Sequence, residues 1–168
     1  ASIFNSSMEW ERSCILASHV GAMERQLEVS IRYARERRQF GQPIGRFQSV
    51  GNRIADMKVR LETARLILYK VAWLKKIERP ATLEAAIAKL YLSESFVESS
   101  LNAIGVHGGY GYMAESEIER DLRDAIGGKL GLPFFILNGD LMDPRVASSQ
   151  QMKAELSEFF LSTVPAKR

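Results

Sequence analysis

Residues 47–71 read FQSVGNRIADMKVRLETARLILYKV. Apolar side chains recur in this stretch every three or four residues, the spacing that places them on one face of an α-helix. The pattern predicts one long amphipathic helix that ends near Glu78-Arg79-Pro80. Its apolar stripe consists of Phe47, Val50, Ile54, Met57, Leu61, Ala64, Leu68 and Val71. A helix of this length is typical of a helical bundle.

A long helix is predicted on each side of this one. The first runs from about Met8 to Arg38 and is interrupted at Phe40-Gly41-Gln42-Pro43, because glycine relaxes the backbone and proline disfavours helix at the preceding residue. Its stripe consists of Leu16, Val20, Met23, Leu27, Ile31 and Ala34. The other begins at Thr82, whose hydroxyl can cap free backbone N–H groups, and is expected to stop at Gly105 and Gly108-Gly109. Its apolar residues are Ile87, Leu90, Val97, Leu101 and Ile104, and serines 93, 95, 99 and 100 give it one face of small side chains suited to close packing.

A shorter helix, from about Glu115 to Ala125 and ended by Gly127-Gly128, completes the set. Four helices joined by short turns predict an all-α fold, an antiparallel four-helix bundle over residues 1–130. Residues 131–168 form a second, divergent region. There, residues 132–137 resemble a buried strand that ends in a turn, and residues 148–161 predict a terminal helix.

Composition narrows the class of protein. With 168 residues, 46% of them hydrophobic and 26% charged, the chain is expected to be a soluble protein with one core. A net charge of +3 is too small to indicate nucleic acid, and apolar runs such as 132–137 are far too short to cross a membrane. We expect neither a disulfide nor a metal site, because the single cysteine, Cys14, has no second thiol to pair with. These features predict a cytoplasmic location.

Three segments resemble the acyl-CoA dehydrogenase family in order and spacing. They are Tyr33-Ala34-Arg35-Glu36-Arg37-Arg38-Gln39-Phe40-Gly41 with the following Phe47-Gln48, His107-Gly108-Gly109-Tyr110-Gly111-Tyr112, and Ile118-Glu119-Arg120-Asp121-Leu122-Arg123-Asp124-Ala125. The resemblance covers roughly residues 4–129. It implies a helical domain that binds FAD at a subunit interface, within a homodimer or homotetramer.

The resemblance also implies cofactor contacts. Arg37 stands at the family's phosphate-binding arginine, Gln39, Phe40 and Gln48 stand at flavin-contacting positions, and Gly109 belongs to a loop at the adenine end. A guanidinium suits this role because it matches phosphate with paired hydrogen bonds. Without the resemblance, Arg35, Arg37 and Arg38 form a solvated basic helix end and the glycines form a plain turn. A lone histidine such as His107 is more often packed than catalytic, and we assign it no role.

Two positions depart from the commonest pattern of the family. Gly105 occupies the place of the glutamine in Gln-x-x-Gly-Gly, which removes one hydrogen bond to the cofactor. No carboxylate precedes Gly131, where many members keep the catalytic glutamate that takes the α proton. Isovaleryl-CoA and long-chain acyl-CoA dehydrogenases carry that base in an early Glu-Arg pair, which Glu11-Arg12 matches. The resemblance therefore implies Glu11 as base and Arg12 as a substrate-side arginine, and the alternative is an ordinary charged first helical turn.

These expectations describe one domain of a flavin-dependent dehydrogenase that acts on an acyl thioester. The alternative is a non-catalytic helical module that kept the bundle for association. Residues 136–145 show a short similarity to the end of the 2-hydroxyacyl-CoA dehydratase and benzoyl-CoA reductase family, but no cysteine ligands for its iron–sulfur cluster accompany it. By itself the chain is expected to bind FAD weakly or not at all and to be inactive, because a tight site encloses most of its ligand.

Overall fold

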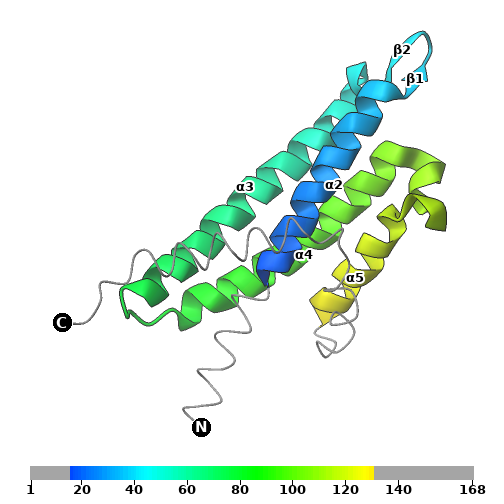
Figure 1. The fold of residues 1–168 in the computed structure, drawn as a ribbon. Coiled ribbons are helices and arrows are strands. Elements are labelled where there is room, and N and C mark those ends of the chain that lie inside the picture. Colours follow the sequence, from blue (N-terminus) through cyan, green and yellow to red (C-terminus); the bar gives the residue numbers. More distant parts are fainter. Residues whose placement is uncertain (1–15, 131–168) are drawn as a thin grey trace.

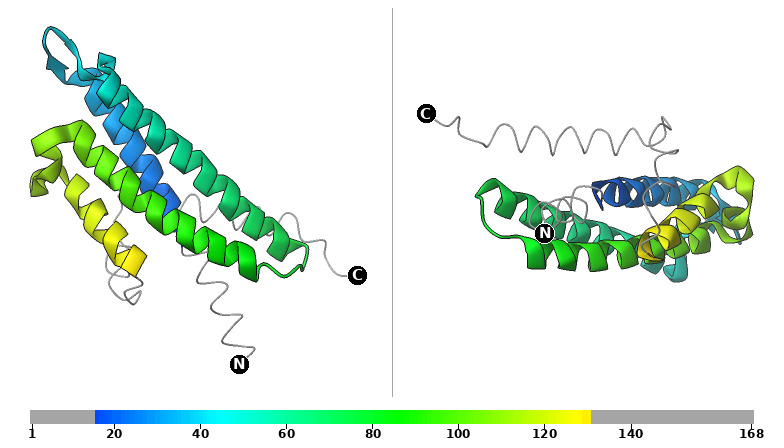
Figure 2. Two further views of the ribbon diagram at one scale, coloured as in Figure 1. Left: turned by 180° about the vertical axis from the view of Figure 1, so that it is seen from behind. Right: turned by 90° about the horizontal axis from the view of Figure 1, so that it is seen from below.

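The computed structural model describes residues 16–130, and within this range the chain is almost wholly helical. Its long elements are α2 (Leu16–Glu36), α3 (Gln48–Lys76), α4 (Thr82–His107) and α5 (Ile118–Leu130). Helices α2, α3 and α4 lie side by side, and α5 folds back along the C-terminal half of α4 (Figure 1). Figure 2 shows the same arrangement from behind and from below. The predicted all-α class is confirmed, with four long helices among residues 16–130.

The core lies where α2, α3 and α4 meet. The predicted stripes of the first two helices supply much of it: Met23 of α2 and Met57 and Leu61 of α3 are each 1% exposed. Leu92 of α4 is fully buried against them. Truncating one such side chain to alanine costs about 2–5 kcal/mol, so these contacts make α2 and α3 a rigid support for the loop that joins them.

The apolar residues that the sequence analysis named in α4 are divided between core and surface: Val97 and Ile104 pack against the core. Ile87, Leu90 and Leu101 are exposed, whereas the buried face is built from small residues and a few large ones. That buried face consists of Ala85, Ala88, Leu92, Ser93, Ser95, Phe96, Ser99, Ser100 and Ala103. Small side chains bring neighbouring helices close, and this close contact decides which face of α4 turns inward.

The serines of α4 are packed inside the bundle, which confirms the close packing predicted from their small side chains. Ser100 Oγ donates to the Phe96 carbonyl at 2.8 Å and accepts from Gln26 Nε2 at 2.7 Å. Ser93 Oγ donates to the Leu90 carbonyl at 3.1 Å. A hydroxyl bonded to its own helix can be buried without a large desolvation cost, so α2 and α4 approach closely here.

The helix stop predicted at Gly108 is confirmed, whereas the stops predicted at Gly105 and at Gly127-Gly128 are wrong. Helix α4 passes through Gly105 and ends at His107, where Gly108 takes a φ of 61° that favours glycine. Helix α5 begins at Ile118 and continues through Gly127-Gly128 to Leu130. A glycine inside a helix costs about 1 kcal/mol but does not break it, and packing of α5 against α4 outweighs that cost.

The predicted break at Phe40-Gly41 is confirmed, and it contains a small hairpin that the sequence analysis did not foresee. Strand β1 (Arg38–Gln39) pairs antiparallel with β2 (Gln42–Pro43). Phe40 and Gly41 form the two-residue turn with φ values of 51° and 80°, the signs of a type I′ turn. A 3₁₀ turn, η1 (Ile44–Arg46), then leads into α3.

Several sequence predictions lie outside the described residues. These are Cys14, the strand-like segment 132–137, the terminal helix 148–161, and the division of the chain at residue 130. They stay predictions. Within residues 16–130, no helix is long and apolar enough to cross a membrane.

Candidate functional site

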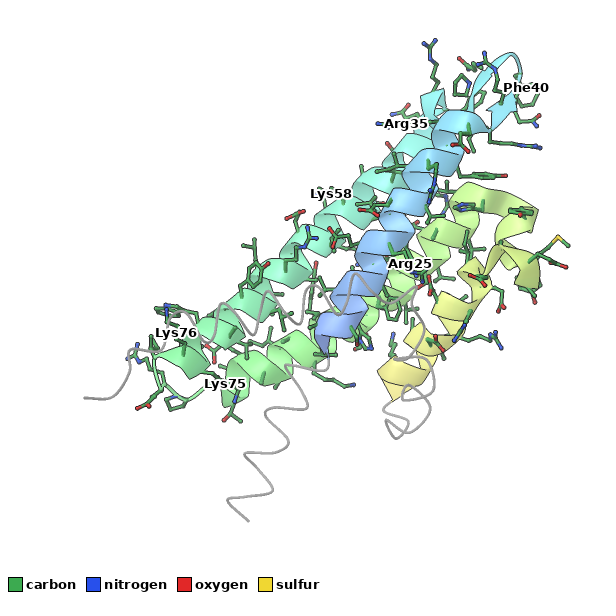
Figure 3. The ribbon with its side chains drawn as sticks, viewed as in Figure 1. Arg25, Arg35, Phe40, Lys58, Lys75 and Lys76 are labelled. Carbon is green, nitrogen blue, oxygen red and sulfur yellow. The ribbon has the colours of Figure 1, made fainter. Side chains whose placement is uncertain are left out.

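All five residues implied as cofactor contacts are solvent-exposed and lie at one end of the bundle. Arg37, Gln39 and Phe40 belong to the hairpin segment, and Gln48 is the first residue of α3. Gly109 lies in η2 (Gly108–Tyr112), the 3₁₀ turn that follows α4. Figure 3 shows Phe40 at this hairpin end, with Lys75 and Lys76 at the opposite end of the bundle.

The backbone holds Arg37 firmly while its side chain stays exposed. Its N–H donates to the Tyr33 carbonyl at 2.8 Å, and its carbonyl accepts from the Ile44 N–H at 2.8 Å. The first bond continues the helical pattern of α2, and the second ties the far side of the hairpin to it. A guanidinium on such an anchored backbone is pre-organised for an anionic ligand.

Phe40 is the most unusual residue of this end. Its side chain is 92% exposed and its φ is 51°. Its ring lies edge-on to the ring of Phe47, with 6.1 Å between the two centroids. The first position of a type I′ turn favours asparagine or glycine, because a bulky side chain in the left-handed region costs about 1–2 kcal/mol. The bundle itself therefore gains little from phenylalanine here, and the exposed ring suits a contact with another molecule.

Tyr33 connects α2 to the glycine turn. Its ring stacks on His107 with 4.3 Å between centroids and lies parallel to Tyr110 at 6.3 Å. His107 is buried, and its Nδ1 donates to the Ala103 carbonyl at 2.8 Å. Burial lowers the pKa of His107, which favours the neutral form of its ring. The packed role favoured for a lone histidine is confirmed, and this stack holds η2 beside α2.

The three glycines of η2 differ in what requires them. Gly108 has a positive φ of 61°, and a Cβ on Gly111 would lie 2.8 Å from the His107 Cβ. Both are needed by the fold of the chain. At Gly109 a Cβ would meet nothing within 4 Å, and its φ is ordinary. Within the described residues nothing demands a glycine at 109, whereas a ligand lying against the backbone would.

Positive charge is concentrated at this end. Residues 32–53 contain six arginines and one acid, Glu36, although the whole chain carries only +3. The arginines are Arg32, Arg35, Arg37, Arg38, Arg46 and Arg53. Such a cluster raises the local concentration of anions. The arrangement combines an anchored arginine, an exposed aromatic ring and bare backbone, which suits a ligand with phosphate and ring systems.

Comparison with known proteins identifies the family. The C-terminal domain of acyl-CoA dehydrogenase matches residues 1–130. The chain belongs to the acyl-CoA dehydrogenase family. The three motifs quoted from the sequence all fall inside the matched range of this acyl-CoA dehydrogenase domain, and the residues after 130, with their short dehydratase-like similarity, fall outside it.

Three relatives of this acyl-CoA dehydrogenase domain are informative. The L-prolyl-(peptidyl-carrier protein) dehydrogenase of Pseudomonas fluorescens is 50% identical over 125 residues, which cover 74% of this chain and 33% of that protein. The crystal structure of the prolyl acyl carrier protein oxidase AnaB is 49% identical with a TM-score of 0.75, covering 94% of this chain and 38% of that one. The FAD complex of PigA is 37% identical with a TM-score of 0.73, covering 92% and 37%. The chain thus spans about a third of the length of these relatives, between 33% and 38%.

One feature of the acyl-CoA dehydrogenase domain escaped the sequence analysis. Arg25 Nη2 donates to Asp121 Oδ1, and Asp121 is only 7% exposed. Burial raises the pKa of Asp121, and nearby Arg25 opposes that rise. Asp121 of the third motif therefore forms an ion pair that joins α5 to α2. Helical spacing offered a signal, since Asp121 shares the face of buried Ile118 and Ala125.

The implied catalytic pair of the acyl-CoA dehydrogenase domain, Glu11 and Arg12, lies outside the described residues. The five implied cofactor positions are gathered at one end of the bundle, but their contact with a cofactor stays a proposal.

Proposed function

We propose that this chain is the C-terminal domain of an FAD-dependent dehydrogenase that forms a double bond between the α and β carbons of an acyl thioester. The observation that carries the proposal is Phe40, an almost fully exposed ring with left-handed backbone beside the anchored Arg37. Membership of the acyl-CoA dehydrogenase family supplies the reaction class, and the FAD complex of PigA supports the cofactor.

The residues at the hairpin end fit the cofactor's chemistry. Arg37 offers a forked cation to the pyrophosphate, Gln39 and Gln48 offer amide donors and acceptors, and Phe40 offers a flat apolar face. Gly109 presents bare backbone at the adenine end. When bound, FAD accepts the hydride that leaves the β carbon. The chain's own part is to hold the cofactor and, through Glu11, to take the α proton.

The substrate class follows from two of the relatives. Both the Pseudomonas fluorescens dehydrogenase and AnaB are named for prolyl groups carried on a carrier protein. We therefore favour a prolyl thioester on a carrier protein over a fatty acyl-CoA, with Arg12 beside the thioester. A prolyl substrate would place the enzyme outside fatty acid metabolism.

Exposed apolar residues at the end opposite the hairpin support the proposal of a homo-oligomer. They come from the C-terminal half of α3 and the first turns of α4, and are Leu66, Tyr69, Trp73, Ile77, Leu83, Ile87 and Leu90. Exposed apolar residues that recur at helical spacing on two paired helices favour an association site. A dimer or tetramer of the complete enzyme would cover it, and sedimentation of that enzyme measures this directly.

FAD binding tests the proposal. The test uses a fusion protein in which this chain replaces the matched 33% of the Pseudomonas fluorescens dehydrogenase. We expect this fusion to bind FAD tightly, whereas the 168-residue chain alone binds it weakly or not at all. Arg37→Gln should weaken FAD binding by about 10- to 100-fold, because it removes a charge-assisted hydrogen bond. Titration followed by flavin fluorescence measures the affinity.

One control variant and one further test variant are compared in the fusion. Arg60→Gln changes an arginine of α3 that is well removed from the hairpin and should leave FAD affinity unchanged. Phe40→Asn should lower FAD affinity without lowering thermal stability, because asparagine suits the left-handed turn better than phenylalanine does. A folded fusion without flavin would reject the cofactor proposal and favour the non-catalytic association module.

The role of Glu11 is tested by flavin bleaching in the same fusion. Glu11→Gln keeps the shape of the side chain and removes its basicity, so bleaching by a prolyl thioester on its carrier protein should slow by about 100-fold or more while FAD stays bound. A matched series with acyl-CoA identifies the preferred thioester. Fast bleaching by the variant would assign the base to another residue.

A further inference from the structure

A neighbouring arginine accounts for the glycine at position 105. A Cβ built on Gly105 would lie 2.8 Å from Arg53 Nη1 and 2.9 Å from Arg53 Cζ. The guanidinium of Arg53, which comes from α3, therefore occupies the space where a side chain at position 105 of α4 would begin. Gly105 lies inside α4 and has no positive φ, so the backbone itself does not require glycine there.

Arg53 is exposed and only lightly engaged by the protein. Its Nη1 donates to Asn102 Oδ1 at 3.1 Å, about one helical turn before Gly105. Among residues 16–130 no carboxylate pairs with it. Asn102 and the bare surface of Gly105 thus hold the guanidinium in place, while its other donors and its full charge remain available to a ligand.

The position of Arg53 links two elements of the candidate site. It lies in the second turn of α3, the helix that begins with Gln48, and it rests on the last turns of α4, which lead directly to Gly109. It also belongs to the arginine-rich segment 32–53 at the hairpin end. The amide that the family resemblance expects at position 105 is absent, and a cation from the neighbouring helix fills its place.

We propose that Arg53 is a second phosphate-binding residue of the FAD site and compensates for the hydrogen bond lost at Gly105. This inference rests on the proposed function. A guanidinium binds a pyrophosphate through paired donors and with full charge, which an amide at position 105 could not offer. The ligand is the pyrophosphate of FAD, and the pyrophosphate of a coenzyme A thioester is the competing source that the test separates.

In the fusion, Arg53→Gln should weaken FAD binding by about 10-fold or more, measured by flavin fluorescence, and should leave the melting temperature of the FAD-free protein nearly unchanged. Arg53→Lys keeps the positive charge but loses the paired donors of the guanidinium, so its FAD affinity should lie between those of the wild-type fusion and Arg53→Gln. Gly105→Gln combined with Arg53→Ala should recover part of the FAD affinity that Arg53→Ala alone loses, because removal of the guanidinium leaves room for the amide side chain at position 105. Arg60→Gln is the matched control on α3.

The outcomes separate this inference from the proposed function. If Arg37→Gln weakens FAD binding and Arg53→Gln changes it by less than about 2-fold, the role of Arg53 is overturned while the FAD site stands. A raised KM for a coenzyme A thioester with unchanged FAD affinity overturns it as well. A folded wild-type fusion that binds no FAD overturns both proposals.

The 168-residue chain alone provides a second measurement, independent of the fusion. Titration with ADP, followed through the Nε–H NMR signals of the arginines, should shift Arg53 and Arg37 together at about millimolar ADP and leave Arg60 in place. A shift at Arg37 without one at Arg53 counts against the inference.

Discussion

Acidification from about pH 7.5 to about pH 5 should lower the free energy of unfolding of this chain by about 2 kcal/mol through His19 alone. His19 is 5% exposed, and neither ring nitrogen finds a hydrogen-bond partner among residues 16–130. Its ring stacks on Phe96 with 5.0 Å between centroids, and a Cβ on Gly128 would come within 3.1 Å of its Cε1. The imidazole is thus enclosed between α4 and α5.

Burial, and secondarily the positive charge of Lys89, lowers the pKa of His19 from 6.5 to about 4. The unfolded chain therefore takes up the proton first. The stabilising contribution is fully present above pH 6.5 and is lost as the pH falls towards about 4, where the loss reaches about 3 kcal/mol. Well below that pH, His19 is protonated in both the folded and the unfolded chain, and the loss of unfolding free energy stops growing.

Urea denaturation of the wild type and of His19→Leu at several pH values measures this effect. The variant should be at least as stable as the wild type at about pH 7.5, because it removes two unbonded buried nitrogens, and it should lack most of the acid loss. His107, the other histidine, is present in both proteins, so its own lowered pKa cancels in the comparison. Equal acid losses in the two proteins would show that His19 is not held neutral.

Arg25→Met should destabilise the fold by about 3 kcal/mol, because it leaves the buried Asp121 carboxylate without its cation. The two residues are 96 positions apart, and their side chains are 31% and 10% exposed. The pair attaches α5 to α2. The matched control is Lys58→Met, which removes an exposed ion pair with Glu62 within α3 and should cost under about 0.5 kcal/mol.

A second substitution identifies the cause of the loss. Asp121→Asn in the Arg25→Met background should restore about half of the lost stability or more, because the amide carries no charge to desolvate. Arg25→Met removes a group that lowers the pKa of Asp121, so that pKa should rise further. If Asp121→Asn instead adds its own cost to that of Arg25→Met, the ion pair is not the source of the effect.

Much of the fold was predictable because local patterns extend over many residues. The apolar spacing in residues 16–36 and 47–71 indicated helices, and Gly41 and Pro43 indicated the break between them. The motifs around Arg37, Gly109 and Asp121 indicated the family. Each of these inferences depends on residue types at fixed separations along the chain, and such separations persist in any packing of the helices.

The sequence by itself thus determined the helices, the break and the family of this protein, whereas other features depended on which side chains meet across helices. Ile87 and Leu90 of α4 lie exposed because the small residues of the opposite face permit closer contact. Helix continues through Gly105 and Gly128 because tertiary packing outweighs their helix propensity. The bond between Arg25 and Asp121 and the fit of Arg53 over Gly105 join residues far apart in sequence, and only the packing of the bundle brings them together.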